Sequence, residues 1–380
     1  MRDKLKGCMV NEILWNGNRG QDKMKQGIQR SINILFLVIG CLLTGGLIFC
    51  VRQQARETRP EPLAGFEVFC GGEEISALFP SEDGLWVGGR DGVKRLDILT
   101  GEVLGYVAED LELIYAAEII RAWDGSVWVG HNAGVTMFAP DGRREDFTAP
   151  VLTGGRVNTL LSVGNQVWAG TMEGASLLEE RDGIWEVREK YTKENGLLAD
   201  PVNVLACGEN EIWFGSYLDN RPGGVSILTA SGWQYLTVEE GLAHPYINAI
   251  LPAGDKVLAA CGQLTAGGLN QIERTGNGFR ITDTFGVQDG IPGAKVRWLY
   301  LDSNGYLWIT TESDGLILTK GTELTHPIDG VVLTWEQGLS DNEIKSIVET
   351  DEYYFLAGRY GLTRIEKQTV AAFMEGENDE

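Results

Sequence analysis

Histidine, which often serves in catalysis and metal binding, is scarce in this sequence. Only three histidines occur among 380 residues, at the well-separated positions 131, 244 and 326. No His-x-x-x-His motif, Ser-His-Asp grouping or phosphate-binding glycine loop is present, so the usual marks of zinc proteases, serine hydrolases and nucleotide-binding enzymes are missing. We therefore expect no catalytic residues, no metal site and no cofactor.

Cysteine is also sparse, and its spacing is irregular. The six cysteines lie at positions 8, 41, 50, 70, 207 and 261 without a Cys-x-x-Cys pair. This spacing fits neither a zinc site nor a disulfide framework. We expect Cys70, Cys207 and Cys261 to pack as small buried hydrophobic residues.

Basic residues are outnumbered, 32 Lys and Arg against 54 Asp and Glu, which gives a net charge of −22. The deficit is uneven, because residues 1–30 hold seven basic and three acidic side chains and residues 31–51 hold none of either. The remainder of the chain is therefore strongly acidic and repels phosphate backbones, so we expect no nucleic-acid partner. The basic arm, residues 1–30, could instead lie against anionic lipid.

A single long uncharged stretch, SINILFLVIGCLLTGGLIFCV, occupies residues 31–51. At about 1.5 Å per residue, a helix of this length matches the roughly 30 Å hydrocarbon core of a bilayer. Basic residues are more numerous before the stretch than after it, which places residues 1–30 in the cytoplasm. We predict a single-pass transmembrane anchor in a bacterial cytoplasmic membrane, with the acidic remainder outside or in the periplasm.

Two alternatives to a retained helix remain open. A cleaved signal peptide would need a small-x-small site soon after the apolar stretch, and none is present there. A lipoprotein signal is the other alternative, because Val38-Ile39-Gly40-Cys41 resembles a lipobox with Cys41 as the lipidated residue, although apolar residues continue to Val51. After the anchor, residues 52–64 include Pro60 and Pro62 and are predicted to form a stiff polar stalk.

A Trp-Gly-centred repeat fills the rest of the sequence. In each copy, an apolar residue and Trp precede a small or β-branched residue, which is usually followed by Gly, as in Val127-Trp128-Val129-Gly130. Three copies are decayed, and in the last, Phe355-Leu356-Ala357-Gly358, we assign Leu356 to the Trp position. Spacings of about 40–50 residues are typical of β-propellers. The seven central positions are 86, 128, 168, 213, 258, 308 and 356.

Each period contains four strand patterns separated by tight Gly-containing turns, such as Asp302-Ser303-Asn304-Gly305. We predict an all-β fold over residues 65–368, a seven-bladed β-propeller of four-stranded antiparallel blades, preceded by one N-terminal transmembrane helix. The Trp side chains should fill the wedges between twisted blades.

The last period holds only three strands, whereas an additional strand at residues 65–70 precedes the first period. We predict that this strand completes the last blade and closes the ring, which removes the open sheet edges. Residues 369–380 are rich in acidic side chains and are predicted to be a disordered tail.

The copies running from Gly196-Leu197 to Gly215 and from Gly338-Leu339 to Gly358 resemble the two-component-regulator propeller repeat. That resemblance implies the seven-bladed propeller of periplasmic sensor domains. No kinase or receiver pattern follows residue 367, so a signalling role would need a partner, such as a separate histidine kinase.

In a propeller, the loops between second and third strands share one face with the loops that join successive blades. We expect these loops to form a ring around one mouth that binds a ligand or partner, because loops on a rigid scaffold commonly carry recognition. The candidate residues are Arg90, Asp91, His131, Asn132, Glu173, Tyr217, Asp219, Asn220, Arg221, His244, Tyr246, Gln263, Lys295, Glu312, Arg359 and Tyr360.

We therefore interpret the chain as a membrane-anchored, non-enzymatic sensor or scaffold that binds an unknown small ligand or an envelope protein. Two alternatives remain. The chain could be a propeller lyase or hydrolase similar to streptogramin lyases. In that case His131 and His244 of this sequence would share the mouth. It could also be an envelope-assembly scaffold.

Overall fold

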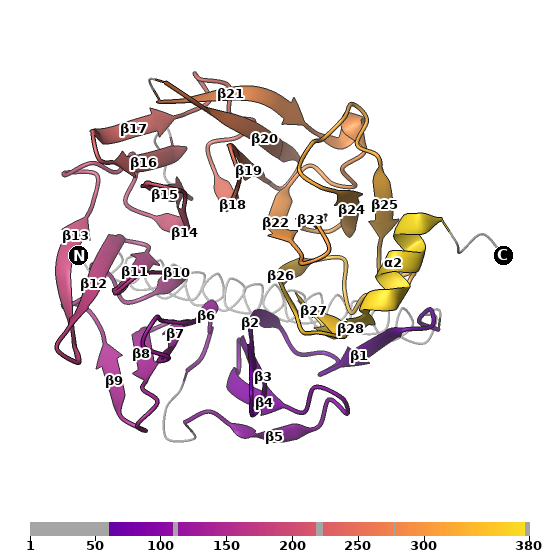
Figure 1. Cartoon of the computed structure of the whole chain (residues 1–380), viewed down its shortest axis with the longest axis horizontal. Coiled ribbons are helices and arrows are strands. Elements are labelled where there is room, and N and C mark those ends of the chain that lie inside the picture. Colours follow the sequence, from indigo (N-terminus) through magenta and orange to yellow (C-terminus); the bar gives the residue numbers. More distant parts are fainter. Residues whose placement is uncertain (1–60, 109–112, 218–222, 277, 377–380) are drawn as a thin grey trace, which may run out of the picture. The chain divides into compact units, whose positions relative to one another are not determined.

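The computed structural model describes residues 61–108, 113–217, 223–276 and 278–376. In this part of the chain, the strands form seven four-stranded antiparallel sheets, which surround a common centre as the blades of a propeller (Figure 1). The predicted fold class is thus confirmed for the propeller. The first strand of each blade lies innermost (Figure 1).

Each blade has four strands, ordered from the innermost outward. Blade 1 contains β2 (Ile75–Ser81), β3 (Gly84–Gly89), β4 (Gly92–Leu96) and β5 (Val103–Tyr106), and blade 2 contains β6 (Glu118–Arg121), β7 (Val127–His131), β8 (Gly134–Phe138) and β9 (Arg144–Phe147). Blade 3 contains β10 (Val157–Val163), β11 (Gln166–Thr171), β12 (Gly174–Arg181) and β13 (Ile184–Tyr191), and blade 4 contains β14 (Val202–Cys207), β15 (Glu211–Ser216), β16 (Val225–Thr229) and β17 (Gly232–Leu236). Blade 5 contains β18 (Ile247–Ala253), β19 (Lys256–Gln263), β20 (Ala266–Thr275) and β21 (Gly278–Phe285), and blade 6 contains β22 (Val296–Leu301), β23 (Tyr306–Thr311), β24 (Leu316–Lys320) and β25 (Gly330–Leu333). Blade 7 contains β26 (Ile344–Glu349), β27 (Tyr353–Gly358), β28 (Gly361–Glu366) and β1 (Phe66–Phe69). The helices are η1 (Val287–Asp289) and α2 (Lys367–Glu375).

The predicted arm, residues 1–30, and the predicted anchor, residues 31–51, lie outside the described residues. Among the residues that are described, no helix has the length and apolar character needed to cross a membrane. The end of the predicted stalk is described, and it is tied to the propeller, because the Leu63 N–H donates to the Gln337 carbonyl at 3.1 Å.

The Trp side chains fill the seams between blades, as expected. Trp128 is fully buried; its ring stacks on Phe147 of its own blade, with centroids 5.4 Å apart, and meets Trp185 of blade 3 edge-on at 4.8 Å. Its indole N–H donates to the Ser126 hydroxyl at 2.7 Å, so the buried polar atom is satisfied. Trp213 meets Phe279 of blade 5 in the same way, at 4.7 Å.

The assignment of Leu356 to the Trp position of blade 7 is wrong by one residue. In β27, Ala357 pairs with Ser346 directly after a register irregularity, in the place that Gly88 occupies in blade 1. Phe355 therefore corresponds to Trp, and its buried ring packs among the residues of blade 1. The repeat was aligned on Gly358, whereas Ala357 is the residue that corresponds to the Gly of the motif. A shift of one residue in a strand moves every side chain to the opposite face.

The additional strand at residues 65–70 appears as β1, and it pairs antiparallel with β28 as the fourth strand of blade 7. Phe66 of β1 is buried, and its ring meets Phe373 of α2 edge-on at 6.0 Å. The ring of blades is thus closed by the two ends of the propeller sequence, which lie in one sheet.

The expected disordered tail at residues 369–380 is wrong for its first part, because α2 covers residues up to Glu375. Val370 is fully buried, and Phe373 and Met374 pack against the same cluster as β1 and β28. Burial of this apolar face supplies the stability that a short helix lacks by itself. Residues 377–380 lie outside the described residues.

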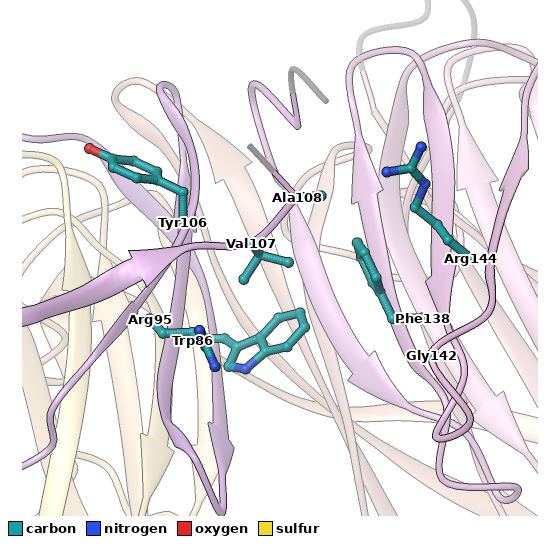
Figure 2. Close-up of a pocket in the computed structure, with 8 residues that line it drawn as sticks. All are labelled: Trp86, Arg95, Tyr106, Val107, Ala108, Phe138, Gly142 and Arg144. Carbon is teal, nitrogen blue, oxygen red and sulfur yellow. The ribbon is translucent and has the colours of Figure 1, made fainter. Parts of the chain in front are cut away.

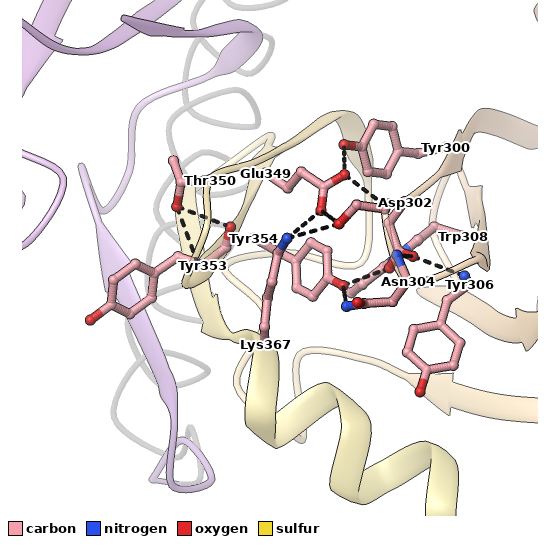
Figure 3. A network of polar contacts seen from close by, with 11 residues as sticks. Tyr300, Asp302, Asn304, Tyr306, Trp308, Glu349, Thr350, Tyr353, Tyr354 and Lys367 are labelled. Atoms are coloured by element: carbon pink, nitrogen blue, oxygen red, sulfur yellow. Dashed lines mark hydrogen bonds and ion pairs between the residues drawn. The ribbon is translucent and has the colours of Figure 1, made fainter. Parts of the chain in front are cut away.

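A polar network joins blades 6 and 7 to α2 (Figure 3). Asp302, in the turn between β22 and β23, accepts hydrogen bonds from the Trp308 indole at 3.0 Å and the Tyr354 hydroxyl at 2.6 Å. Glu349 accepts from Tyr300 at 2.9 Å and forms an ion pair with Lys367 at 2.5 Å. The Asp302 carboxylate is thus a structural acceptor in a hairpin turn that links two blades.

Glu118, on the inner strand of blade 2, lies in the seam with blade 3, where it accepts a 2.7 Å hydrogen bond from the Leu160 N–H. Burial raises the pKa of Glu118 to about 7, although hydrogen bonds from Leu160 and Thr159 oppose part of this rise. Burial acts in this direction because it disfavours the charged form of a carboxyl group.

We expect the stability of the propeller to fall between about pH 5 and pH 8 through Glu118. The folded carboxyl keeps its proton up to about pH 7, whereas the unfolded one loses it near its ordinary pKa of about 4.3. The native state therefore binds more protons in this window, so the free energy of unfolding decreases as pH rises. Urea unfolding at pH 5 and pH 8 should show a smaller decrease in Glu118→Gln than in the wild type; equal decreases would contradict this assignment.

Candidate functional site: the propeller mouth

The predicted loops that fall within the described residues lie on one face of the propeller. In several blades, the loop after the second strand donates a backbone hydrogen bond to the link that enters the same blade. Examples are Tyr217 N–H to Pro201, Glu312 N–H to Lys295, and Arg359 N–H to Glu343, with N···O distances of 3.2, 3.1 and 3.4 Å. These bonds hold the two kinds of loop against each other and form the rim of the mouth.

Five of the predicted residues gather on the rim of blades 4 to 6, and we call them the aromatic–lysine cluster: Tyr217, His244, Tyr246, Lys295 and Glu312. The Tyr246 ring lies 5.3 Å from the Tyr217 ring and 4.9 Å from the His244 ring, between centroids. The Lys295 ammonium is 5.8 Å from the centre of the Tyr217 ring, within the range of a cation–π contact. Three blades thus contribute to one continuous surface.

Lys295 is buried, with only 5% of its surface exposed, and its ammonium lies 2.6 Å from a carboxylate oxygen of Glu312. Burial alone would raise the pKa of Glu312, but the hydrogen bond and charge of Lys295, together with the charge of Arg297, lower it on balance. Glu312 is therefore ionised, and a buried charge of this kind is stable only while its partner is present.

His244 is half-buried, and its pKa is lowered by burial and by the positive charge of Lys295. The neutral imidazole accepts a hydrogen bond at Nδ1 from the Tyr246 N–H at 3.1 Å. Its proton is consequently on Nε2, which makes this nitrogen a hydrogen-bond donor. The cluster thus combines two aromatic faces, a neutral donor and an ion pair.

Asparagines just below the rim were missed in the sequence. Asn158, Asn203 and Asn248 occupy the register irregularity at the start of three successive inner strands. Each donates through Nδ2 to a carbonyl of the next blade, at 3.0, 2.9 and 2.8 Å respectively. The recurring Val-Asn or Ile-Asn pair at a spacing of 45 residues was the available signal.

Charged residues occupy the same inner-strand positions in blades 6 and 7. Arg297 and Lys345 lie 3.8 and 3.7 Å from the buried Glu343 carboxylate, and Lys345 also pairs with Glu74 of blade 1 at 2.5 Å. Hydrogen bonds link the inner strands of blades 3 to 6, whereas ion pairs link those of blades 6, 7 and 1.

The remaining predicted residues do not form one group. His131 is buried beneath the rim, apart from the aromatic–lysine cluster, and its Nε2 lies 3.1 Å from the Thr136 hydroxyl. Arg359 lies over the Tyr360 ring at 5.7 Å, and Gln263 is half-buried. Asp219, Asn220 and Arg221 lie outside the described residues, and the remaining rim residues are Arg90, Asp91, Asn132 and Glu173.

The described part of the chain also shows the state of three cysteines and the placement of possible metal ligands. Cys70 and Cys207 are half-buried, Cys261 is buried, and all three are free thiols. Burial raises the pKa of Cys261 to about 12, so the thiol stays protonated. The described residues include no group of three or more His, Cys, Asp or Glu side chains placed to hold a metal ion.

Several solved structures share this fold. The extracellular domain of a protein assigned as a hybrid two component system in B. thetaiotaomicron aligns with a TM-score of 0.66 and 17% identity, over 81% of this chain and 42% of that one. Virginiamycin B lyase from Staphylococcus aureus aligns with a TM-score of 0.58 and 16% identity, over 79% and 98%. PorZ, a surface component of the type-IX secretion system of Porphyromonas gingivalis, aligns with a TM-score of 0.52 and 12% identity, over 79% and 37%.

At these identities the structural matches show the fold alone, and the chain spans about two fifths of the first of these proteins. No curated protein matches the sequence. A family model does match: residues 290–313, which include Lys295 and Glu312 of the aromatic–lysine cluster, fit the two component regulator propeller. The chain therefore carries the two component regulator propeller repeat within a seven-bladed propeller.

Proposed function

We propose that the propeller is a non-enzymatic binding module that takes a ligand or a partner protein at its mouth. The aromatic–lysine cluster carries this proposal. Aromatic rings supply contact area at a small cost in conformational entropy, and such rings with a few placed polar groups are typical of recognition surfaces. Tyr217 and Tyr246 supply the rings, while His244 Nε2 supplies a donor.

We further propose that residues 31–51 anchor the propeller to a bacterial cytoplasmic membrane and that it acts outside the cytoplasm as an envelope sensor or scaffold. The basic arm before this apolar stretch supports the orientation. The fold is shared with the extracellular domain of a two component system protein, and this analogy supports a sensor that reports through a separate partner.

Chemical crosslinking followed by pull-down of the full chain from its native membrane tests this proposal. Removing the central ring of the cluster in Tyr246→Ala should reduce the recovered partner at least about tenfold, as is common for an interface hot spot. Tyr235→Ala is the matched control, because Tyr235 is an exposed tyrosine on the outermost strand of blade 4 and its loss should leave recovery unchanged.

The identity of the partner separates the two forms of the proposal. A histidine kinase would support the sensor, whereas envelope-assembly proteins would support the scaffold. Equal recovery with Tyr246→Ala and Tyr235→Ala would contradict binding at the mouth. A turnover activity that is lost in both His131→Ala and His244→Ala would instead favour the lyase alternative.

A further inference from the structure

A cavity of about 370 Å³ opens in the seam between blades 1 and 2. Its lining comes from the second, third and fourth strands of blade 1 and from the outer strands of blade 2 and their connections. Figure 2 shows Val107 next to the rings of Trp86 and Phe138, with Arg95 beside Trp86 and Arg144 beyond Phe138. This pocket shares no residue with the aromatic–lysine cluster at the mouth.

The pocket exists because the fourth strand of blade 2 does not cover the Trp of blade 1 with an aromatic residue; the ring of Phe138, from the third strand, meets Trp86 only edge-on. At two other seams, the fourth strand of the following blade packs an aromatic ring into the same space; Trp185 covers Trp128 and Phe279 covers Trp213. Trp128 and Trp213 are consequently fully buried, whereas Trp86 is partly exposed.

The cross-strand register shows which residue of blade 2 stands where blade 4 has an aromatic residue. In blade 4, Trp233 stands opposite Leu228 and packs in the seam with blade 3. In blade 2, Arg144 stands opposite Phe138, the residue that corresponds to Leu228. Arg144 therefore occupies the position that Trp233 fills in blade 4, and a guanidinium lines the space that an indole would close.

The walls and the polar groups of the pocket define what it can bind. Trp86 and Phe138 meet edge-on with centroids 5.8 Å apart, and the buried Val107 lies beside this pair of rings. Arg95 and Arg144 contribute guanidinium groups, which are always charged and can only donate hydrogen bonds. Arg95 is held in place by an ion pair with Asp83.

We propose that this pocket binds small planar aromatic carboxylates. A flat ring fits against the aromatic walls, and a carboxylate is the acceptor that guanidinium groups pair with in bidentate geometry. The volume lies within the range of about 300–1,000 Å³ that is typical of small-molecule pockets. The site is separate from the mouth, so this inference does not depend on the proposed function.

Binding of 2-naphthoate to the purified full chain, measured by isothermal titration calorimetry, tests the inference. Saturable binding with one site per chain is expected, and the uncharged 2-naphthamide should bind at least about tenfold more weakly, since it lacks the charge-assisted pairing. Absence of saturable naphthoate binding, or equal affinities for the two compounds, would overturn the assignment.

Two variants at one position locate the binding. Arg144→Trp restores the cover seen in blade 4; it should abolish naphthoate binding and raise the melting temperature. Arg144→Ala keeps the aromatic walls and should weaken binding about tenfold, through loss of a charge-assisted pair. Arg280→Ala is the control, because Arg280 is an exposed arginine on the outer strand of blade 5. Naphthoate binding that persists in Arg144→Trp would place the site elsewhere and refute the proposal.

Discussion

Deleting residues 65–70 from the full chain is expected to destabilise the whole propeller, by more than about 5 kcal/mol. The deletion removes β1, and with it the buried Phe66 side chain and the backbone hydrogen bonds to β28. Loss of a buried Phe side chain costs about 3–5 kcal/mol, and each intramolecular hydrogen bond adds about 1 kcal/mol. The deletion would also leave β28 as an open sheet edge, which favours aggregation.

Urea unfolding followed by tryptophan fluorescence measures this effect, because Trp residues lie in blades far from blade 7. Phe66→Ala should reproduce most of the loss. Glu67→Gln changes the exposed neighbour in the same strand and should stay within about 1 kcal/mol of the wild type, as expected for a partly exposed ion pair. An unchanged midpoint after the deletion would show that the ring does not need β1.

Replacing Trp128 by Ala is expected to cost about 3–5 kcal/mol, the second large effect. Trp128 is fully buried between Phe147 and Trp185, so the substitution opens a cavity in the seam of blades 2 and 3. It also leaves the Ser126 hydroxyl without the indole that donates to it.

Trp86→Ala is the matched control for this cost. Trp86 holds the same position in blade 1 but is partly exposed beside the pocket, so its loss should cost about 1–2 kcal/mol, as for a side chain with part of its area already in water. Chemical unfolding of the two variants in parallel gives the comparison. Equal costs would contradict the idea that the following blade's aromatic cover determines the stability of each seam.

The blade architecture could be predicted from the sequence because the same pattern of strand and turn residues occurs seven times. The error at Phe355 arose where the repeat had lost its Trp and an Ala-Gly pair offered two positions for the match. The family match at residues 290–313 falls on a copy in which Thr310 stands in the place of Gly. In such copies, the distance in sequence between successive repeats indicated a blade more clearly than the Trp-Gly motif did.

The helix α2 was missed for a different reason. Four acidic residues dominated the composition of this segment, namely Glu375, Glu377, Asp379 and Glu380. Val370, Phe373 and Met374, spaced three and four residues apart, were the opposing signal. This spacing places them on one face of a helix, but its partner surface on β1 is far away in the sequence.

The candidate site could be predicted only as a set of loops. Strand order was sufficient to place Tyr217, Tyr246 and Lys295 on one face, because it determines at which end of a blade each loop lies. Which of them meet depends on loop conformation and on the packing of neighbouring blades, which the sequence does not state. The pocket at Trp86 depends likewise on the cross-strand neighbour of Phe138.

Closure by β1 also has a consequence for synthesis on the ribosome. Glu67 and its ion-pair partner Arg364 are 297 residues apart in the chain. At translation rates of about 5–20 residues per second, β1 would wait for roughly 15–60 s before its partner strand exists. During that interval the nascent chain has a completed first strand with no sheet to join, so chaperone occupancy of residues 66–69 would protect it from pairing with the wrong edge.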